Sequence, residues 1–411
     1  MSIGRKPILT FFSIAAKSVA RLAVNKAFAV YFGTTGITLL AHFQNLIGLI
    51  TQLPNDGVNR GLSHLLQSNK DAKAIKKLTG TALLFNLILF SFTSVIIYLF
   101  KDYFFGHFDI INETLFYVIF FSSVIVFVFN LFLQAFILSL KNAMIYAVTN
   151  ILGMGLLLIA VLAGVQTMTL DHALLAFSIG QALSILVTVF IIIRFKTSGH
   201  LNLSFSVTDL KKLSEFLLVV FSVLVFSKLV DFGVRHYAMS EFGYKLAGLW
   251  QSVVKISDSY MSLFIATVGV VFYPQVSALV FDTDKLRKYI KDVLYIVTPV
   301  TIIGLFLIYV FRIPILNLLF TEEFIPAHYL IKYQLIGDFF GIISYLLIYI
   351  VSAQARTLTF ILLQFGSAVL YISLIAMLRN DFGVEAFPMA HSARFIIFFV
   401  VLIILNRRIL F

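Results

Sequence analysis

Four polar side chains interrupt a long apolar stretch at a spacing that places them on one side of a helix. They are Gln251, Lys255, Asp258 and Ser262. The stretch, residues 248–264, also holds the only tryptophan, Trp250. At 100° per residue the four side chains fall within about 60° of one another. A charge at the centre of a bilayer costs about 3 kcal/mol or more, so we expect this stripe to face other helices or water.

Other apolar stretches carry charges as well, and most of these charges are positive. The cations are Lys17, Arg21, Lys26, Lys228, Arg235, Lys255 and Arg394, and the acids are Asp231, Asp258 and Asp338. Because cations outnumber acids by seven to three, a cavity lined by these stripes would be net positive even with every acid paired. Such a cavity attracts polyanions and repels cations. Phosphate or diphosphate is the expected ligand, since Arg and Lys donate charge-assisted hydrogen bonds to it.

Structural roles are the alternative for several of these residues. Two groups of side chains could form neutralised structural ion pairs. One is Lys255 with Asp258, and the other is Lys228 with Asp231 and Arg235. Asp338 shares a helix face with Gln334 and Tyr345, and it is either a helix-packing acceptor or a proton or cation site. Arg394 accompanies only His391 in its span, and a structural role and a functional role are equally possible for it. The histidines show no metal-ligand spacing, so no metal site is expected.

The elements that position these residues are membrane helices. Of 411 residues, 60% are hydrophobic and 12% are charged, whereas soluble domains average about 25% charged. This composition predicts an all-α polytopic membrane protein. Windows of about 20 apolar residues predict twelve spans. They cover approximately 8–30, 37–59, 78–100, 115–139, 144–165, 172–194, 213–237, 246–273, 293–311, 331–352, 358–378 and 386–405.

Lysine and arginine placement predicts the orientation of the spans. Basic residues concentrate in alternate connections, which predicts two cytoplasmic termini. Phe-Gly pairs at 32–33 and 242–243 precede the second and eighth spans, each of which leads into a basic connection. We therefore expect two pseudo-symmetric six-helix lobes, 1–200 and 201–411, around a central cationic cavity.

Enzyme signatures are absent from the sequence. There is no Walker loop, GxSxG or HExxH motif, and no cysteine. A membrane glycosyltransferase or repeat-unit polymerase would require a sizeable external loop with catalytic groups, and the longest expected here covers about residues 312–330. We predict a transporter without cofactors, not an enzyme, and no nucleic-acid partner.

Three segments resemble the Wzx family of bacterial polysaccharide flippases, in particular its WzxE-like branch. They are AVYFGTTGITLLAHFQNLIGL (29–49), GLWQSVVKISDSY (248–260) and YQLIGDFFGIISYLLIYIVSAQA (333–355). The family belongs to the multidrug/oligosaccharidyl-lipid/polysaccharide exporter superfamily. The resemblance implies two six-helix lobes that open alternately to each side of the bacterial inner membrane. A multidrug cation antiporter of the same superfamily is the alternative, but it predicts an acidic cavity.

The resemblance implies an undecaprenyl-diphosphate-linked oligosaccharide as substrate, of the enterobacterial common antigen or O-antigen type. It further implies membrane lipid, a polysaccharide polymerase and a chain-length regulator as partners. Each class of buried polar residue then has an expected role. The expected diphosphate ligands are Lys17, Arg21, Lys228, Arg235 and Lys255, the sugar contacts are Gln44, Trp250 and Gln251, and the ion-coupling acids are Asp231, Asp258 and Asp338.

Overall fold

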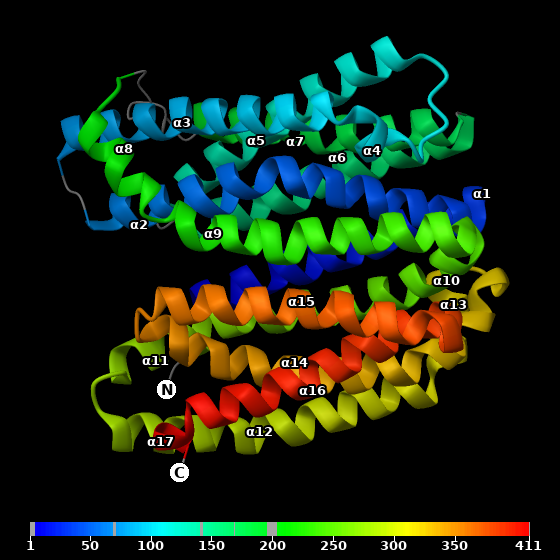
Figure 1. The fold of residues 1–411 in the computed structure, drawn as a ribbon. Helices are drawn as coiled ribbons and strands as arrows, with labels where there is room; N and C mark the ends of the chain where they lie inside the picture. The colour runs from blue at the N-terminus through cyan, green and yellow to red at the C-terminus, as the bar shows by residue number, and fades with distance from the viewer. Residues whose placement is uncertain (1–4, 69–70, 140–142, 168, 195–203, 411) are drawn as a thin grey trace. The chain divides into compact units, whose positions relative to one another are not determined.

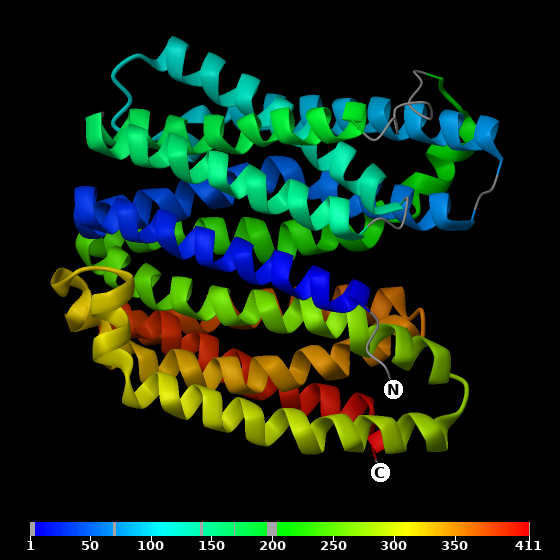
Figure 2. The same ribbon diagram turned by 180° about the vertical axis from the view of Figure 1, so that it is seen from behind.

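Helices make up all the regular secondary structure of the described residues. The computed structural model describes residues 5–68, 71–139, 143–167, 169–194 and 204–410 (Figures 1 and 2). A helix satisfies its own N–H and C=O groups, as a bilayer requires. The α-helices are α1 Arg5–Gln52, α2 Arg60–Ser68, α3 Ala72–Leu99, α4 Lys101–Phe105, α5 Glu113–Ser139, α6 Ala143–Thr167, α7 Leu170–Arg194, α8 Val207–Ser214, α9 Leu217–Val223, α10 Val230–Thr267, α11 Tyr273–Leu279, α12 Thr283–Val310, α13 Arg312–Leu319, α14 His328–Ala353, α15 Thr357–Phe382, α16 Ala386–Leu405 and α17 Arg407–Leu410.

Eight helical segments of the described chain are long and apolar enough to cross a membrane. Two of them, Leu217–Thr267 and Thr357–Leu405, are more than twice as long as the roughly 20 residues that one crossing needs. Each contains a glycine with positive φ where the chain turns back, Gly243 or Gly383, and α1 does the same at Gly33. Each of these three segments, α1, Leu217–Thr267 and Thr357–Leu405, therefore has two arms. The six arms and the other six of the eight apolar segments add up to twelve. The predicted all-α, multi-span membrane fold is confirmed.

Two of the reversal points are the glycines of the repeated Phe-Gly pairs. Gly33 has φ 58° and ψ −148°, and Gly243 has φ 76° and ψ 167°. These conformations are almost exclusive to glycine, because a Cβ would clash with the backbone. The sequence pattern thus marks the positions where one span ends and the next begins.

Three π-helical segments interrupt the spans near prolines or charged residues. They are Leu53–Asn59, Leu224–Leu229 and Val268–Phe272. The first contains Pro54, and Pro274 follows the third. Proline lacks an N–H donor, so a local change of hydrogen-bonding register accommodates it. The second segment contains Lys228 instead, and π-helical turns are common at functional sites.

The chain forms two compact units. The first comprises Met1–Tyr31 and Leu39–Phe232, and the second comprises Phe32–Thr38 and Gly233–Phe411. The core of the first unit includes Phe132 and Phe136 of α5, and that of the second includes Leu346 and Ile350 of α14. The lobe boundary at residue 200, the internal symmetry and the cationic cavity stay predictions.

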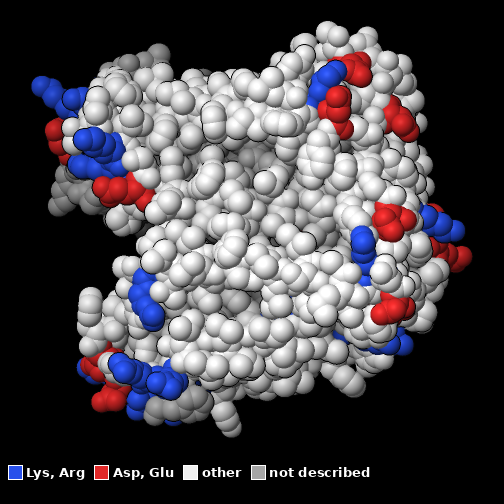
Figure 3. All heavy atoms as spheres, in the orientation of Figure 1, with Lys and Arg blue, Asp and Glu red and all other residues white. Residues whose placement is uncertain are grey.

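Charged side chains on the face shown in Figure 3 gather toward the ends of the helices. Between them the surface of this face is almost entirely uncharged. One end carries the exposed pair Lys285 and Asp282, joined by an ion pair of 2.8 Å, and Asp282 also caps the N-terminus of α12. The Lys285 ammonium hydrogen-bonds to the Asp282 carboxylate and lowers its pKa. An apolar band bordered by charges is the surface that a bilayer requires.

Candidate functional site

Three of the five expected diphosphate ligands belong to the first unit. Lys17 and Arg21 lie one turn apart on α1, where Lys17 is half-buried and Arg21 exposed. The Lys17 Nζ atom lies 5.7 Å from the centre of the Tyr146 ring on α6, a cation–π contact. Lys228 is half-buried in its π-helical segment, and its carbonyl accepts a hydrogen bond of 3.4 Å from Asn45 Nδ2.

The other two expected ligands, Arg235 and Lys255, lie on α10 in the second unit. Arg235 precedes the reversal at Gly243, and its Nε donates to Gln251 Oε1 at 3.0 Å on the following arm. This bond therefore joins the two arms of α10. Lys255 is only 9% exposed, so its side chain is packed among helices, which is one of the two surroundings expected for the stripe.

The expected sugar contacts differ in accessibility. Gln44 is half-buried on α1, whereas Gln251 is 1% exposed and already accepts from Arg235. Trp250 is 5% exposed and stacks on Phe387 of α16, with 4.5 Å between ring centres and 22° between ring planes. In this conformation Phe387 covers one face of the indole ring. The assignment of the three as sugar contacts stays a prediction.

The three acids lie in different surroundings. Asp338 is buried, Asp231 is half-buried and Asp258 is exposed, whereas all three were expected from the sequence to be buried. At the turn of Asp258, α10 buries Ser257 instead, which lies one residue and about 100° away.

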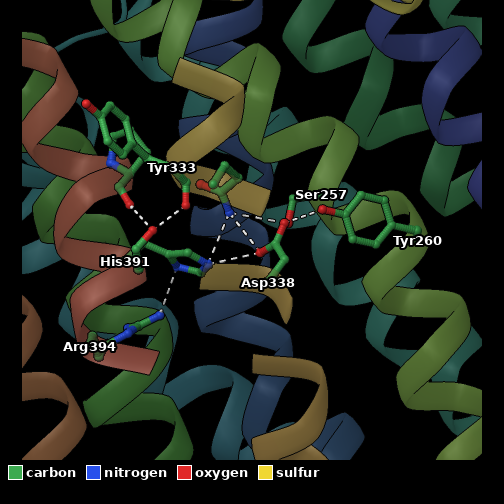
Figure 4. Close-up of polar contacts among 9 residues, drawn as sticks. Ser257, Tyr260, Tyr333, Asp338, His391 and Arg394 are labelled. Atoms are coloured by element: carbon green, nitrogen blue, oxygen red, sulfur yellow. Dashed lines mark hydrogen bonds and ion pairs between the residues drawn. The ribbon is translucent and has the colours of Figure 1, made fainter. Parts of the chain in front are cut away.

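Asp338 lies at the centre of a polar network in the second unit (Figure 4). Its side chain is 2% exposed, and both carboxylate oxygens accept hydrogen bonds. Ser257 Oγ donates to Oδ2 at 2.7 Å, and the Tyr260 hydroxyl donates to the same oxygen. Gln334 Nε2 donates to Oδ1 at 3.0 Å, and His391 Nε2 lies at 3.0 Å from Oδ1. Four donors from α10, α14 and α16 therefore converge on one carboxyl group.

His391 connects this carboxyl group to a half-buried arginine. Arg394 Nη2 lies 3.3 Å from His391 Nδ1. A guanidinium can only donate, so Nδ1 accepts and Nε2 carries the hydrogen that points at Asp338. The Arg394 guanidinium also stacks on Tyr371 of α15, 4.3 Å from the ring centre. Asp338, His391 and Arg394 thus form a continuous chain of hydrogen bonds between α14 and α16.

Sequence reasoning identified Asp338 and Gln334 on one helix face but missed their partners. Ser257 and Tyr260 lie on α10 outside the predicted stripe, and His391 lies on α16, where it was expected to accompany only Arg394. The available signal was chemical: His391 and Arg394 are one turn apart in an otherwise apolar span, where polar side chains pair with one another. Groups of three His, Cys, Asp or Glu side chains with a metal-binding arrangement are absent from the described residues.

Known proteins resemble this chain along nearly its whole length. No protein-family model matches it. It is 23% identical over 409 residues to the lipid III flippases of Escherichia coli strain K12 and Shigella flexneri, covering 97% of each chain. An inward-facing multidrug resistance MATE family transporter of the MOP superfamily superposes with a TM-score of 0.72 at 13% identity, over 99% of this chain and 94% of that one. The protein is therefore a multi-pass membrane protein with the fold of MATE transporters.

Proposed function

We propose that the protein is a flippase for undecaprenyl-diphosphate-linked oligosaccharides. It moves the glycan repeat from the cytoplasmic to the periplasmic leaflet of the bacterial inner membrane by alternating access. The observation that carries this proposal is the similarity to two lipid III flippases over 97% of the chain. The MATE-like fold supports transport by two helical units, and it is equally compatible with other substrates.

The chemistry of the span residues supports an anionic headgroup. Lys17, Arg21, Lys228, Arg235 and Lys255 would bind the diphosphate. Arginine and lysine form charge-assisted hydrogen bonds with phosphate oxygens. Lys255 is 9% exposed, so an anion bound to it would lie away from bulk water, where charge-assisted hydrogen bonds are strongest.

The rest of the substrate requires different surroundings. Gln44, Gln251 and Trp250 would contact the sugars, since amides and aromatic rings suit hydroxyl groups and pyranose faces. The prenyl tail would stay in the lipid. Because Trp250 stacks on Phe387 and Gln251 accepts from Arg235, contact with sugar requires these two to change partners during the transport cycle.

Ion coupling would use the buried carboxyl group of Asp338. Its four hydrogen-bonding partners come from three helices, so a movement of these helices would change the surroundings of the carboxyl group. Asp231 and Asp258 are weaker candidates because they are half-buried and exposed, respectively. The predicted cytoplasmic termini and a polymerase and chain-length regulator as partners complete the proposal.

A multidrug cation antiporter is the second candidate because its fold is the same. The charges of the spans favour the anionic substrate, since three acids accompany seven cations. An antiporter would export a lipophilic cation such as ethidium in exchange for protons. Ethidium efflux driven by a pH gradient in proteoliposomes, without movement of lipid-linked sugar, would favour this candidate.

Reconstitution tests the diphosphate ligands. Proteoliposomes would contain an undecaprenyl-diphosphate-linked sugar that carries a nitrobenzoxadiazole label, and external dithionite would report which leaflet holds it. We expect Arg21→Gln and Lys255→Met each to slow translocation about tenfold or more, because a hydrogen bond to a charged group contributes about 1.5–3 kcal/mol. Lys255→Met preserves the apolar stem.

Lys245→Gln is the matched control, because Lys245 is an exposed cation of the same helix, two residues after Gly243. Its translocation rate should equal that of the unaltered protein. Unchanged rates in both Arg21→Gln and Lys255→Met would refute the diphosphate assignment. A protein that moves no labelled lipid at all would refute the flippase function.

A further inference from the structure

An apolar groove runs along the outside of the second unit between α12 and α14. Its volume is about 380 Å³, within the range of roughly 300–1,000 Å³ that is usual for ligand sites. Leu305 and Leu335 form a buried floor, and Ile302, Phe306 and Ile336 form exposed walls. The most apolar part of α12 is not buried against the described chain, so the groove lies on the periphery of the unit.

Two cations lie at one end of this groove. Lys332, the only charged lining residue, is exposed, and its Nζ atom lies 4.5 Å from the centre of the Tyr333 ring. Arg312 lies 4.3 Å from the centre of the ring of Tyr309, which lines the groove, and it donates to the Tyr309 carbonyl at 2.7 Å. Along the chain the nearest acid to Arg312 is Glu322, and the nearest to Lys332 is Asp338, whose carboxyl group accepts from Ser257, Tyr260 and Gln334.

The two cations have no carboxylate partner within ion-pair distance among the described residues. Of the two glutamates that precede α14, Glu323 accepts a hydrogen bond from Thr34 Oγ1 at 3.1 Å, and Glu322 is exposed. Lysine and arginine stacked on tyrosine rings at a helix end are typical of the depth at which lipid headgroups lie. The end of the groove therefore offers positive charge where a headgroup would be.

We propose that this groove binds one acyl chain of an anionic phospholipid, whose phosphate lies against Lys332 and Arg312. The apolar floor and walls match a hydrocarbon chain, and the one charged end matches an anionic headgroup. The site is confined to α12, α13 and α14, and it includes none of the residues assigned to the oligosaccharide. The proposal therefore does not depend on the proposed flippase function.

A tryptophan in the groove wall provides the test. In a Trp250→Phe background, Phe306→Trp supplies a single reporter, and lipids with brominated acyl chains quench it on contact. In phosphatidylethanolamine vesicles we expect brominated phosphatidylglycerol to be enriched over brominated phosphatidylethanolamine about fivefold per cation, since each cation near a membrane surface contributes about 1 kcal/mol. Lys332→Gln should reduce the enrichment about fivefold, and Lys245→Gln should leave it unchanged.

Three results would overturn the proposal. Equal quenching by both brominated lipids would show that the groove does not select charge, and selectivity that survives Lys332→Gln with Arg312→Gln would place its cause elsewhere. Displacement of brominated phosphatidylglycerol by equimolar undecaprenyl diphosphate would assign the groove to the substrate tail instead. If the reporter protein does not fold, native mass spectrometry of the unaltered chain and Lys332→Gln measures the same preference as bound phosphatidylglycerol per protein.

Discussion

Replacing Asp338 by asparagine and by alanine separates a structural role of this residue from a coupling role. Asparagine is nearly isosteric and can keep every hydrogen bond: its oxygen accepts from Gln334 and His391, and its amide donates to the hydroxyl oxygens of Ser257 and Tyr260. Alanine removes the acceptor that these four partners share, although Gln334 Nε2 keeps an alternative in Ser257 Oγ at 3.3 Å. The two substitutions should therefore differ strongly in stability.

The magnitudes follow from the number of stranded donors. The hydroxyls of Ser257 and Tyr260 can rotate toward other acceptors, but the N–H groups of Gln334 and His391 are fixed. Each buried donor that is left without an acceptor costs about 1–3 kcal/mol, so Asp338→Ala should lower the free energy of unfolding by about 3 kcal/mol or more. Asp338→Asn weakens charge-assisted bonds by about 1 kcal/mol each, but it also avoids burying a carboxylate, which costs several kcal/mol. For Asp338→Asn the free energy of unfolding should therefore change by no more than about 2 kcal/mol.

Thermal unfolding in detergent and transport in proteoliposomes measure the two effects. We expect Asp338→Asn to remain folded and to lose the acceleration of lipid translocation by an imposed pH gradient, because an amide does not take up a proton. Equal stability of the alanine and asparagine variants would show that the network does not stabilise the unit. An asparagine variant that still responds to the pH gradient would refute coupling through Asp338.

Two further substitutions test the fold. Gly33→Ala should destabilise the protein by about 1–3 kcal/mol, because its φ of 58° and ψ of −148° suit glycine alone and the new Cβ would lie 2.6 Å from Glu323 Oε2. The control Gly48→Ala, in the helical part of α1 with no atom within 4 Å of the new Cβ, should be neutral or stabilising by up to about 1 kcal/mol; similar thermal shifts for the two would contradict the role of Gly33. Asn130→Ala should lower thermal stability by about 1 kcal/mol, since buried Asn130 Oδ1 accepts from Thr188 Oγ1 at 2.6 Å, and an unchanged melting temperature would show that this bond contributes little.

Hydropathy and glycine placement are local signals, and they predicted the fold well. Runs of about 20 apolar residues indicate spans regardless of their partners, and the pairs at Gly33 and Gly243 mark reversals because the backbone conformation there is specific to glycine. The π-helical segment that contains Lys228 was not predicted. Such a segment depends on a small change of hydrogen-bonding register that hydropathy does not record.

The candidate site was predicted less completely because its partners come from separate helices. The stripe on α10, expected to face other helices or water, contains the buried Gln251 and Lys255 and the exposed Asp258, and it omits the buried Ser257. An error of one position rotates a side chain by about 100°, which is enough to turn it from a helix interface to the surface. The partnership of His391 with Asp338 depends on how α14 packs against α16, and spacing within one helix contains no such information.

Leaflet exchange of a labelled undecaprenyl-diphosphate-linked oligosaccharide tests the flippase proposal most directly. Purified protein in liposomes should make the label of both leaflets accessible to external dithionite, whereas protein-free liposomes should lose only the outer half. The same protein should leave ethidium distribution unchanged under a pH gradient. Labelled lipid that stays in its original leaflet while ethidium moves would contradict the flippase function and identify the protein as a cation transporter.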